Sequence, residues 1–160
     1  MKKAKDSMSD TQEKYFLDSI RSLLLIGDYR LAGKAFRQIT EVLFRHFQGN
    51  AFSPEINVFI SENAYKNQEE KTESDHKFPL KEIYQDLLQK QNFDNIQLKE
   101  YLKNKIIYVH LTVEEHKKLS FNDRKSNRGF DFEYETHGIK ILSAKRIGRG
   151  RKFIIQNELL

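Results

Sequence analysis

The chain contains no cysteine and no tryptophan, and its 160 residues include only two prolines and seven glycines. The absence of cysteine excludes disulfides, thiolate metal sites and cysteine nucleophiles, and it fits a reducing compartment, so we expect a cytoplasmic protein. Long apolar runs are missing too. The longest, residues 23–26 and 106–108, are far too short to cross a bilayer, and residues 1–5 lack the apolar run of a signal peptide.

The motifs of common enzyme classes are also missing. The sequence has no glycine-rich phosphate loop of the Walker or Rossmann kind, no Gly-x-Ser-x-Gly and no His-Glu-x-x-His. We therefore expect no cofactor, no metal site and no catalytic residues, and we favour a protein without enzymatic activity.

The residues that are present predict an α+β protein. Twelve phenylalanines and seven tyrosines supply bulk for a core. Apolar residues recur at helical spacing from Asp10 to Gly27 and again from Asp28 to about residue 50, with Asp10 and Glu13 as a capping box. The short link between them predicts an antiparallel helix pair over residues 1–50, which offers a face for a possible homodimer.

The remaining chain divides into a polar stretch and a mixed segment. Residues 51–78 read as a loop or linker because 61–76 are almost entirely polar. Residues 79–160 then predict two helices, a strand near 106–111, and a short helix opened by a Thr112–Glu115 capping box. Strict alternation at 130–135 predicts a strand, and 139–144 and 153–155 complete a C-terminal three-stranded antiparallel meander.

The strongest functional signal is a basic hairpin at the end of the chain. Residues 140–152 carry six cations and no acid, and two glycines allow a tight turn around Arg149. Guanidinium groups pair with phosphate oxygens in a two-pronged geometry, and lysines add positive charge. The predicted nucleic-acid contacts are the six hairpin cations and three from the preceding loop: Lys140, Lys145, Arg146, Arg149, Arg151, Lys152, Arg124, Lys125 and Arg128.

Helices followed by a basic β-hairpin resemble a winged helix, in which one helix enters the major groove and the hairpin touches the backbone or minor groove. The sequence differs from the usual winged-helix pattern in two ways. The strand near 106–111 is expected to follow two helices, and the helix after it begins with two acids, Glu114 and Glu115, which suit a phosphate-facing helix N-terminus poorly.

Two patterns leave an enzyme as a weaker alternative. In the alternating segment, every second residue is a potential ligand of a hard metal and would lie on one face of the strand: Asp131, Glu133, Glu135 and His137. Cross-strand ion pairs produce the same pattern. His110 lies in a His-x-Thr sequence that resembles one half of the twin motif of two-histidine phosphoesterases. The second half is missing, because no other histidine has a threonine two positions on.

These observations favour a non-enzymatic protein that binds DNA or RNA through the basic hairpin. The principal alternative is an adaptor or inhibitor that docks the same hairpin on an acidic protein partner. A small phosphodiesterase or nuclease is the less favoured third hypothesis.

Overall fold

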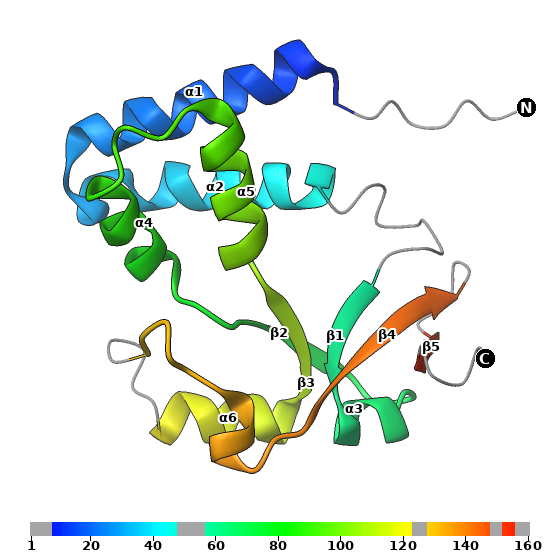
Figure 1. Cartoon of the computed structure of the whole chain (residues 1–160). Coiled ribbons are helices and arrows are strands. Elements are labelled where there is room, and N and C mark those ends of the chain that lie inside the picture. The colour runs from blue at the N-terminus through cyan, green and yellow to red at the C-terminus, as the bar shows by residue number, and fades with distance from the viewer. Residues whose placement is uncertain (1–7, 48–56, 123–127, 148–151, 156–160) are drawn as a thin grey trace, which may run out of the picture. The chain divides into compact units, whose positions relative to one another are not determined.

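The computed structural model describes residues 8–47, 57–122, 128–147 and 152–155, and it describes the backbone alone at residues 57, 120–122, 146, 147, 152 and 155. The chain divides into two compact units, each assembled from two stretches of sequence. The first unit holds residues 1–51 and 78–106, and the second holds 52–77 and 107–160 (Figure 1). None of the helices in the described part of the chain is long and apolar enough to cross a membrane.

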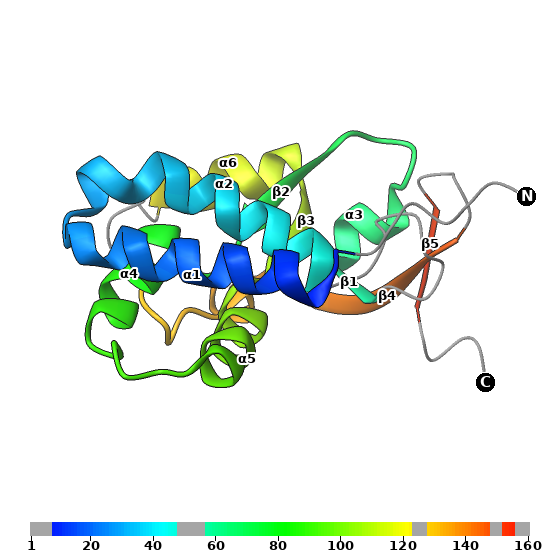
Figure 2. The ribbon, with the colours of Figure 1, turned by 90° about the horizontal axis from the view of Figure 1, so that it is seen from above.

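The first unit is helical. It consists of α1 (Asp10–Ile26), α2 (Tyr29–Phe47), α4 (Leu80–Leu88) and α5 (Asn95–Lys105). Gly27 ends α1 with a φ of 70°, a conformation that favours glycine, and the chain returns as α2 alongside α1 (Figure 2). The predicted helix pair is therefore confirmed, but the capping box forms one residue earlier than predicted, between Ser9 and Gln12.

Aromatic packing and one buried hydroxyl hold this unit together. The rings of Phe36 and Tyr84 meet edge to face with their centroids 5.3 Å apart, and both side chains are fully buried. The Tyr84 hydroxyl donates a hydrogen bond of 2.6 Å to the backbone oxygen of Leu23. This bond ties α4 to the last turn of α1 and satisfies a polar atom that burial would otherwise penalise.

The second unit is built on a five-stranded sheet. Its strands are β1 (Asn57–Ser61), β2 (Thr72–His76), β3 (Tyr108–Thr112), β4 (Ile141–Ile147) and β5 (Lys152–Ile155). They lie in the order β2-β3-β1-β4-β5, so β2 and β5 are the two edges. The β1–β3 pair is parallel and the other pairs are antiparallel. Short α3 (Glu62–Lys66), α6 (Val113–Asn122) and the 3-10 helix η1 (Tyr134–His137) complete the unit.

Side-chain alternation along the strands gives the sheet two packed faces. On the α6 face, Val109 and Leu111 are buried with Leu119 of α6 and with Phe132, Tyr134 and Ile139 from the chain before β4. On the opposite face, which we call the α3 face, Ile60, Ala144 and Phe153 are buried with Ala64 of α3. The Thr112–Glu115 capping box opens α6 as predicted, with bonds of 3.0 and 3.1 Å.

Three predictions are corrected. Residues 51–78 are not a linker, because β1, α3 and β2 lie in this segment and belong to the sheet. Residues 130–135 are not a strand. Phe132 and Tyr134 are buried as the alternation required, but through a turn and η1, so the third strand beside the β4–β5 hairpin is β1. The helices at 80–105 join the first unit and not the sheet, so the boundaries differ from those predicted.

The winged-helix resemblance does not extend to the sheet. Here the hairpin extends a five-stranded mixed sheet, and it belongs to a different unit from α1 and α2. The broader prediction is confirmed: the chain is α+β, with an N-terminal helix pair, further helices and C-terminal antiparallel strands.

Candidate nucleic-acid interface

The predicted basic hairpin forms as the β4–β5 pair at one edge of the sheet. Ile147 pairs with Lys152 and Arg146 pairs with Phe153, so the backbone of both arms is in the register of a hairpin with a four-residue connection, residues 148–151. Lys145 is half-buried on β4 and pairs with Ile154. Arg149 and Arg151 lie in the connection, outside the described residues. This arrangement brings Lys145, Arg146 and Lys152 to the part of the hairpin nearest that connection.

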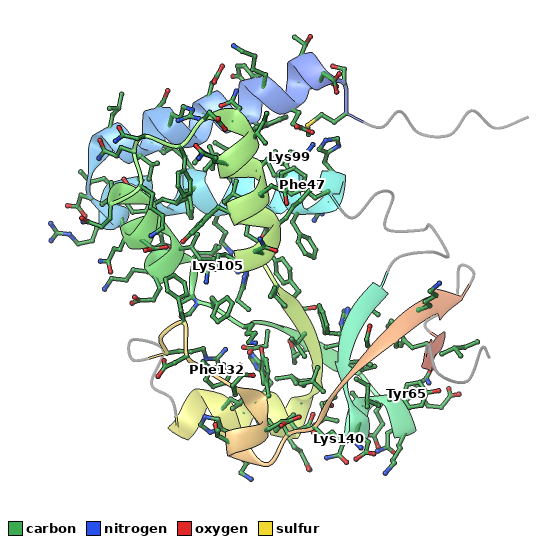
Figure 3. The ribbon with its side chains drawn as sticks, viewed as in Figure 1. Phe47, Tyr65, Lys99, Lys105, Phe132 and Lys140 are labelled. Atoms are coloured by element: carbon green, nitrogen blue, oxygen red, sulfur yellow. The ribbon has the colours of Figure 1, made fainter. Side chains whose placement is uncertain are left out.

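Lys140 does not belong to the same cluster. It precedes the far end of β4, about 20 Å of strand away from Ile147. Its ammonium group lies 3.6 Å from a carboxylate oxygen of Glu62, at the start of α3 (Figure 3). Most of the length of β4 therefore separates Lys140 from Lys145 and Arg146.

Arg128 is placed at the opposite edge of the sheet, where it forms part of the fold. Its side chain is 9% exposed, and its Nη1 donates bonds of 2.7 Å to Asp75 Oδ2 and to the backbone oxygen of His76, both on β2. Its guanidinium also covers the ring of Phe132, 4.0 Å from the ring centroid. Because β2 and β5 are four strand spacings apart, about 19 Å, Arg128 is not alongside the hairpin.

Asp75 is the centre of this network. Besides Arg128, it accepts a hydrogen bond of 2.7 Å from the Tyr134 hydroxyl, and His116 Nε2 lies 3.7 Å from its other oxygen. Burial, followed by the charge of Asp75 and the hydrogen bond to it, raises the pKa of the Tyr134 hydroxyl far above its usual value. Tyr134 is therefore a permanent donor, and the network joins β2 to the chain around η1. The other two loop cations predicted as contacts, Arg124 and Lys125, lie outside the described residues.

A pocket on the α3 face adjoins the hairpin and was missed by sequence reasoning. Its volume is about 240 Å³, and its walls come from β1, β2, β3, β5, α3 and the loop after α3. The lining includes the side chains of His110, Ser74, Thr72, Gln68 and Phe153. We call it the His110 pocket. Ser74 pairs with His110 across β2 and β3, a register that single-strand patterns do not reveal.

Gln68 connects this pocket to the hairpin. Its side-chain amide donates a bond of 3.1 Å to the backbone oxygen of Phe153 and accepts one of 2.8 Å from the Phe153 backbone nitrogen. The amide thus pairs with the outer edge of β5 as a neighbouring strand would. Unpaired backbone groups at a sheet edge are otherwise open to other chains. Gln68 therefore covers the edge at Phe153 and holds that residue in the pocket wall.

The structure bears differently on the two patterns that suggested an enzyme, the acidic segment 131–137 and His110. Asp131, Glu133, Glu135 and His137 do not share a strand face, because this segment is not a strand, and no group of three metal-ligating residues is present in the described part of the chain. Glu133 instead lies 3.5 Å from Lys77. His110 does line a pocket, but no second histidine is among the described residues that line it. His76 shares the α3 face and packs against Tyr108, with ring centroids 4.2 Å apart.

Comparison of the chain with protein-family models, with curated proteins and with solved structures finds no match in any of the three.

Proposed function

We propose that this protein binds nucleic acid, without catalysing a reaction on it, through the β4–β5 hairpin. The contacts to phosphate would come from five hairpin cations: Lys145, Arg146, Arg149, Arg151 and Lys152. The observation that carries the proposal is the register of the hairpin, in which Ile147 pairs with Lys152. This register places Lys145, Arg146 and Lys152 on the two paired arms of one hairpin at a sheet edge, next to a connection that contains two more arginines.

The chemistry of this element suits a polyanion. Neither arm of the hairpin carries an acid, so positive charge is not neutralised within it. Arginine is the side chain best matched to phosphate, because its planar guanidinium donates two parallel hydrogen bonds. Contacts of this type fix the position of a protein on a nucleic acid without reading its sequence. The proposal therefore assigns the hairpin affinity and not sequence specificity. The lack of cysteine agrees with a place in the cytoplasm.

Lys140 and Arg128 are left out of this interface for the reasons of geometry given above. Lys140 is next to Glu62, and Arg128 is bound to Asp75. We expect substitution of either residue by alanine to leave nucleic-acid affinity almost unchanged, whereas substitution of the hairpin arginines will reduce it.

The test compares two double variants that remove the same charge. In Arg149→Ala/Arg151→Ala the two arginines next to the hairpin glycines are lost. The matched control, Arg30→Ala/Arg37→Ala, removes two exposed arginines of α2. We expect the hairpin variant to bind labelled oligonucleotides about tenfold more weakly or worse, and the control to bind as the parent does. Equal affinity of both variants would refute the assignment of the hairpin.

The competing hypothesis of an acidic protein partner predicts a different pattern. It predicts that neither DNA nor RNA binds at low salt, and that an acidic protein is retained on the parent but not on the hairpin variant. That result would replace the proposal with the adaptor function.

A further inference from the structure

The His110 pocket lies directly beside the proposed phosphate-binding hairpin. Phe153 forms part of its wall and pairs with Arg146 of β4, so the pocket wall and a hairpin cation occupy paired positions of the hairpin register. Gln68 holds Phe153 in place through two hydrogen bonds to its backbone. The wall is therefore fixed before any ligand arrives, which limits the ordering cost of binding.

The lining of the pocket combines rings with hydroxyl groups. The His110 and Phe153 rings have centroids 5.7 Å apart and are inclined by 39°, so they form adjoining walls and do not stack face to face. Thr72 and Ser74 add two hydroxyls from the edge strand β2. Neither hydroxyl has a hydrogen-bond partner among the described residues, and Ser74 is exposed. A planar, polar ring is the chemical group that such a combination accepts.

The size of the pocket limits the ligand further. At about 240 Å³ it is below the range of roughly 300–1,000 Å³ that is usual for sites of drug-sized ligands and cofactors. It has room for one ring system and not for a complete dinucleotide. Glu70 and Lys71 also line the pocket, and Lys71 is 77% exposed and 3.4 Å from Glu73, so this wall carries charges of both signs.

From these features we propose that the His110 pocket takes up one unpaired base of a single-stranded nucleic acid whose phosphates contact the hairpin. This proposal rests on the proposed function and makes it more specific. A base in a duplex is stacked between its neighbours and shows only its edge, whereas an unpaired base can be splayed out and stacked on aromatic or histidine rings. The hydroxyls of Thr72 and Ser74 then bond to polar atoms on the base.

Two pocket variants and one control distinguish a base-binding pocket from nucleic-acid binding by the hairpin alone. His110→Ala removes a ring wall, and Ser74→Phe fills the pocket from an exposed position, where a larger side chain does not disturb the core. His137→Ala is the same change as the first, at a half-buried histidine outside the pocket. Thermal unfolding identifies any variant that fails to fold.

The probes are a short single-stranded RNA, the DNA strand of the same sequence and the corresponding DNA duplex, each end-labelled for anisotropy. A second copy of each single strand carries one 2-aminopurine, whose fluorescence falls when the base stacks. We expect the parent to prefer a single strand over the duplex and to quench 2-aminopurine. Both pocket variants should lose about tenfold in single-strand affinity and lose the quenching, while duplex affinity and the His137→Ala control stay as in the parent.

The outcomes are distinguishable. If the parent binds single strands and duplex equally and both pocket variants bind as the parent does, the pocket is not a base site, although the hairpin function stands as long as Arg149→Ala/Arg151→Ala weakens binding. If the parent binds none of the probes at low salt, the proposed function and this inference are both refuted.

Discussion

Replacing Arg128 with alanine should destabilise the sheet unit strongly and leave nucleic-acid binding unchanged. In the sequence Arg128 is one of several cations near the hairpin, but in the structure its side chain is 9% exposed and that of Asp75 is 12% exposed. The variant removes two hydrogen bonds of 2.7 Å and the contact of the guanidinium with the Phe132 ring. It leaves the Asp75 carboxylate largely buried without its principal cation.

The expected loss in the free energy of unfolding depends on the partners that Asp75 keeps in the variant. Removing one partner of a buried ion pair typically costs about 3–5 kcal/mol, because the other charge stays behind. Here Asp75 keeps the hydrogen bond from Tyr134 and the neighbouring His116. We therefore expect the lower end of this range, about 3 kcal/mol in the free energy of unfolding. Arg128→Lys restores the charge but not the planar fork, so it should recover only part of the loss.

A double-mutant cycle measures the interaction directly. Chemical denaturation is followed for Arg128→Ala, Asp75→Ala and the double variant, and the coupling energy is taken from the three differences. We expect coupling of about 2 kcal/mol or more, together with parental oligonucleotide affinity in every variant that folds. A loss of less than about 0.5 kcal/mol for Arg128→Ala, combined with weakened binding, would refute the structural role and return Arg128 to the interface.

Two further predictions concern other contacts. Gln68→Glu replaces the donor to the Phe153 carbonyl with a carboxylate, so we expect a loss of about 1–2 kcal/mol and faster amide exchange at Phe153, whereas Gln38→Glu, the same change at an exposed position of α2, should have little effect. Glu13 is affected by burial, which raises its pKa, but bonds with His46 and Lys99 outweigh burial and lower it overall. Its contribution to stability is present above the unfolded pKa of about 4.3 and is lost as pH falls through the lower folded value. Thermal unfolding between neutral and acid pH should therefore show a smaller acid-induced loss in Glu13→Gln, and an unaltered profile would contradict the assignment.

The helices could be predicted from the sequence because their signals are local. Each of these signals is made by residues that are close together in the sequence: Gly27 at the end of α1, the Thr112–Glu115 capping box, and the apolar spacing within α1, α2 and α4. The β4–β5 hairpin is local in the same sense. Propensity and capping are decided at this range, so the pattern and the fold agree.

The sheet could not be predicted in full because its pairing is distant in sequence. The central strand β1 is a run of five residues, too short to identify alone, and its partners β3 and β4 lie far along the chain. The edge strand β2, Thr-Glu-Ser-Asp-His, buries none of its residues completely and has the composition of a loop. Only its pairing with β3 distinguishes β2 from a loop.

The same distinction between local and distant signals applies to the candidate site. The hairpin cations are visible as a run, but the separation of Lys140 from the others requires the strand's length, and the role of Arg128 requires Asp75, 53 residues away. The His110 pocket joins residues between Ile60 and Phe153 through strand register. No local pattern marks it, although the polar residues 61–76 contribute several of its walls.

The most direct test of the central claim is the salt dependence of oligonucleotide binding by the parent and by Arg149→Ala/Arg151→Ala. If the five hairpin cations each neutralise one phosphate, log affinity should fall with log salt with a slope of about −3.5 on single strands and about −4.5 on duplex DNA. The double variant should reduce the single-strand slope to about −2. Binding whose slope is the same in both proteins, or the absence of binding at low salt, would contradict a nucleic-acid interface on the hairpin.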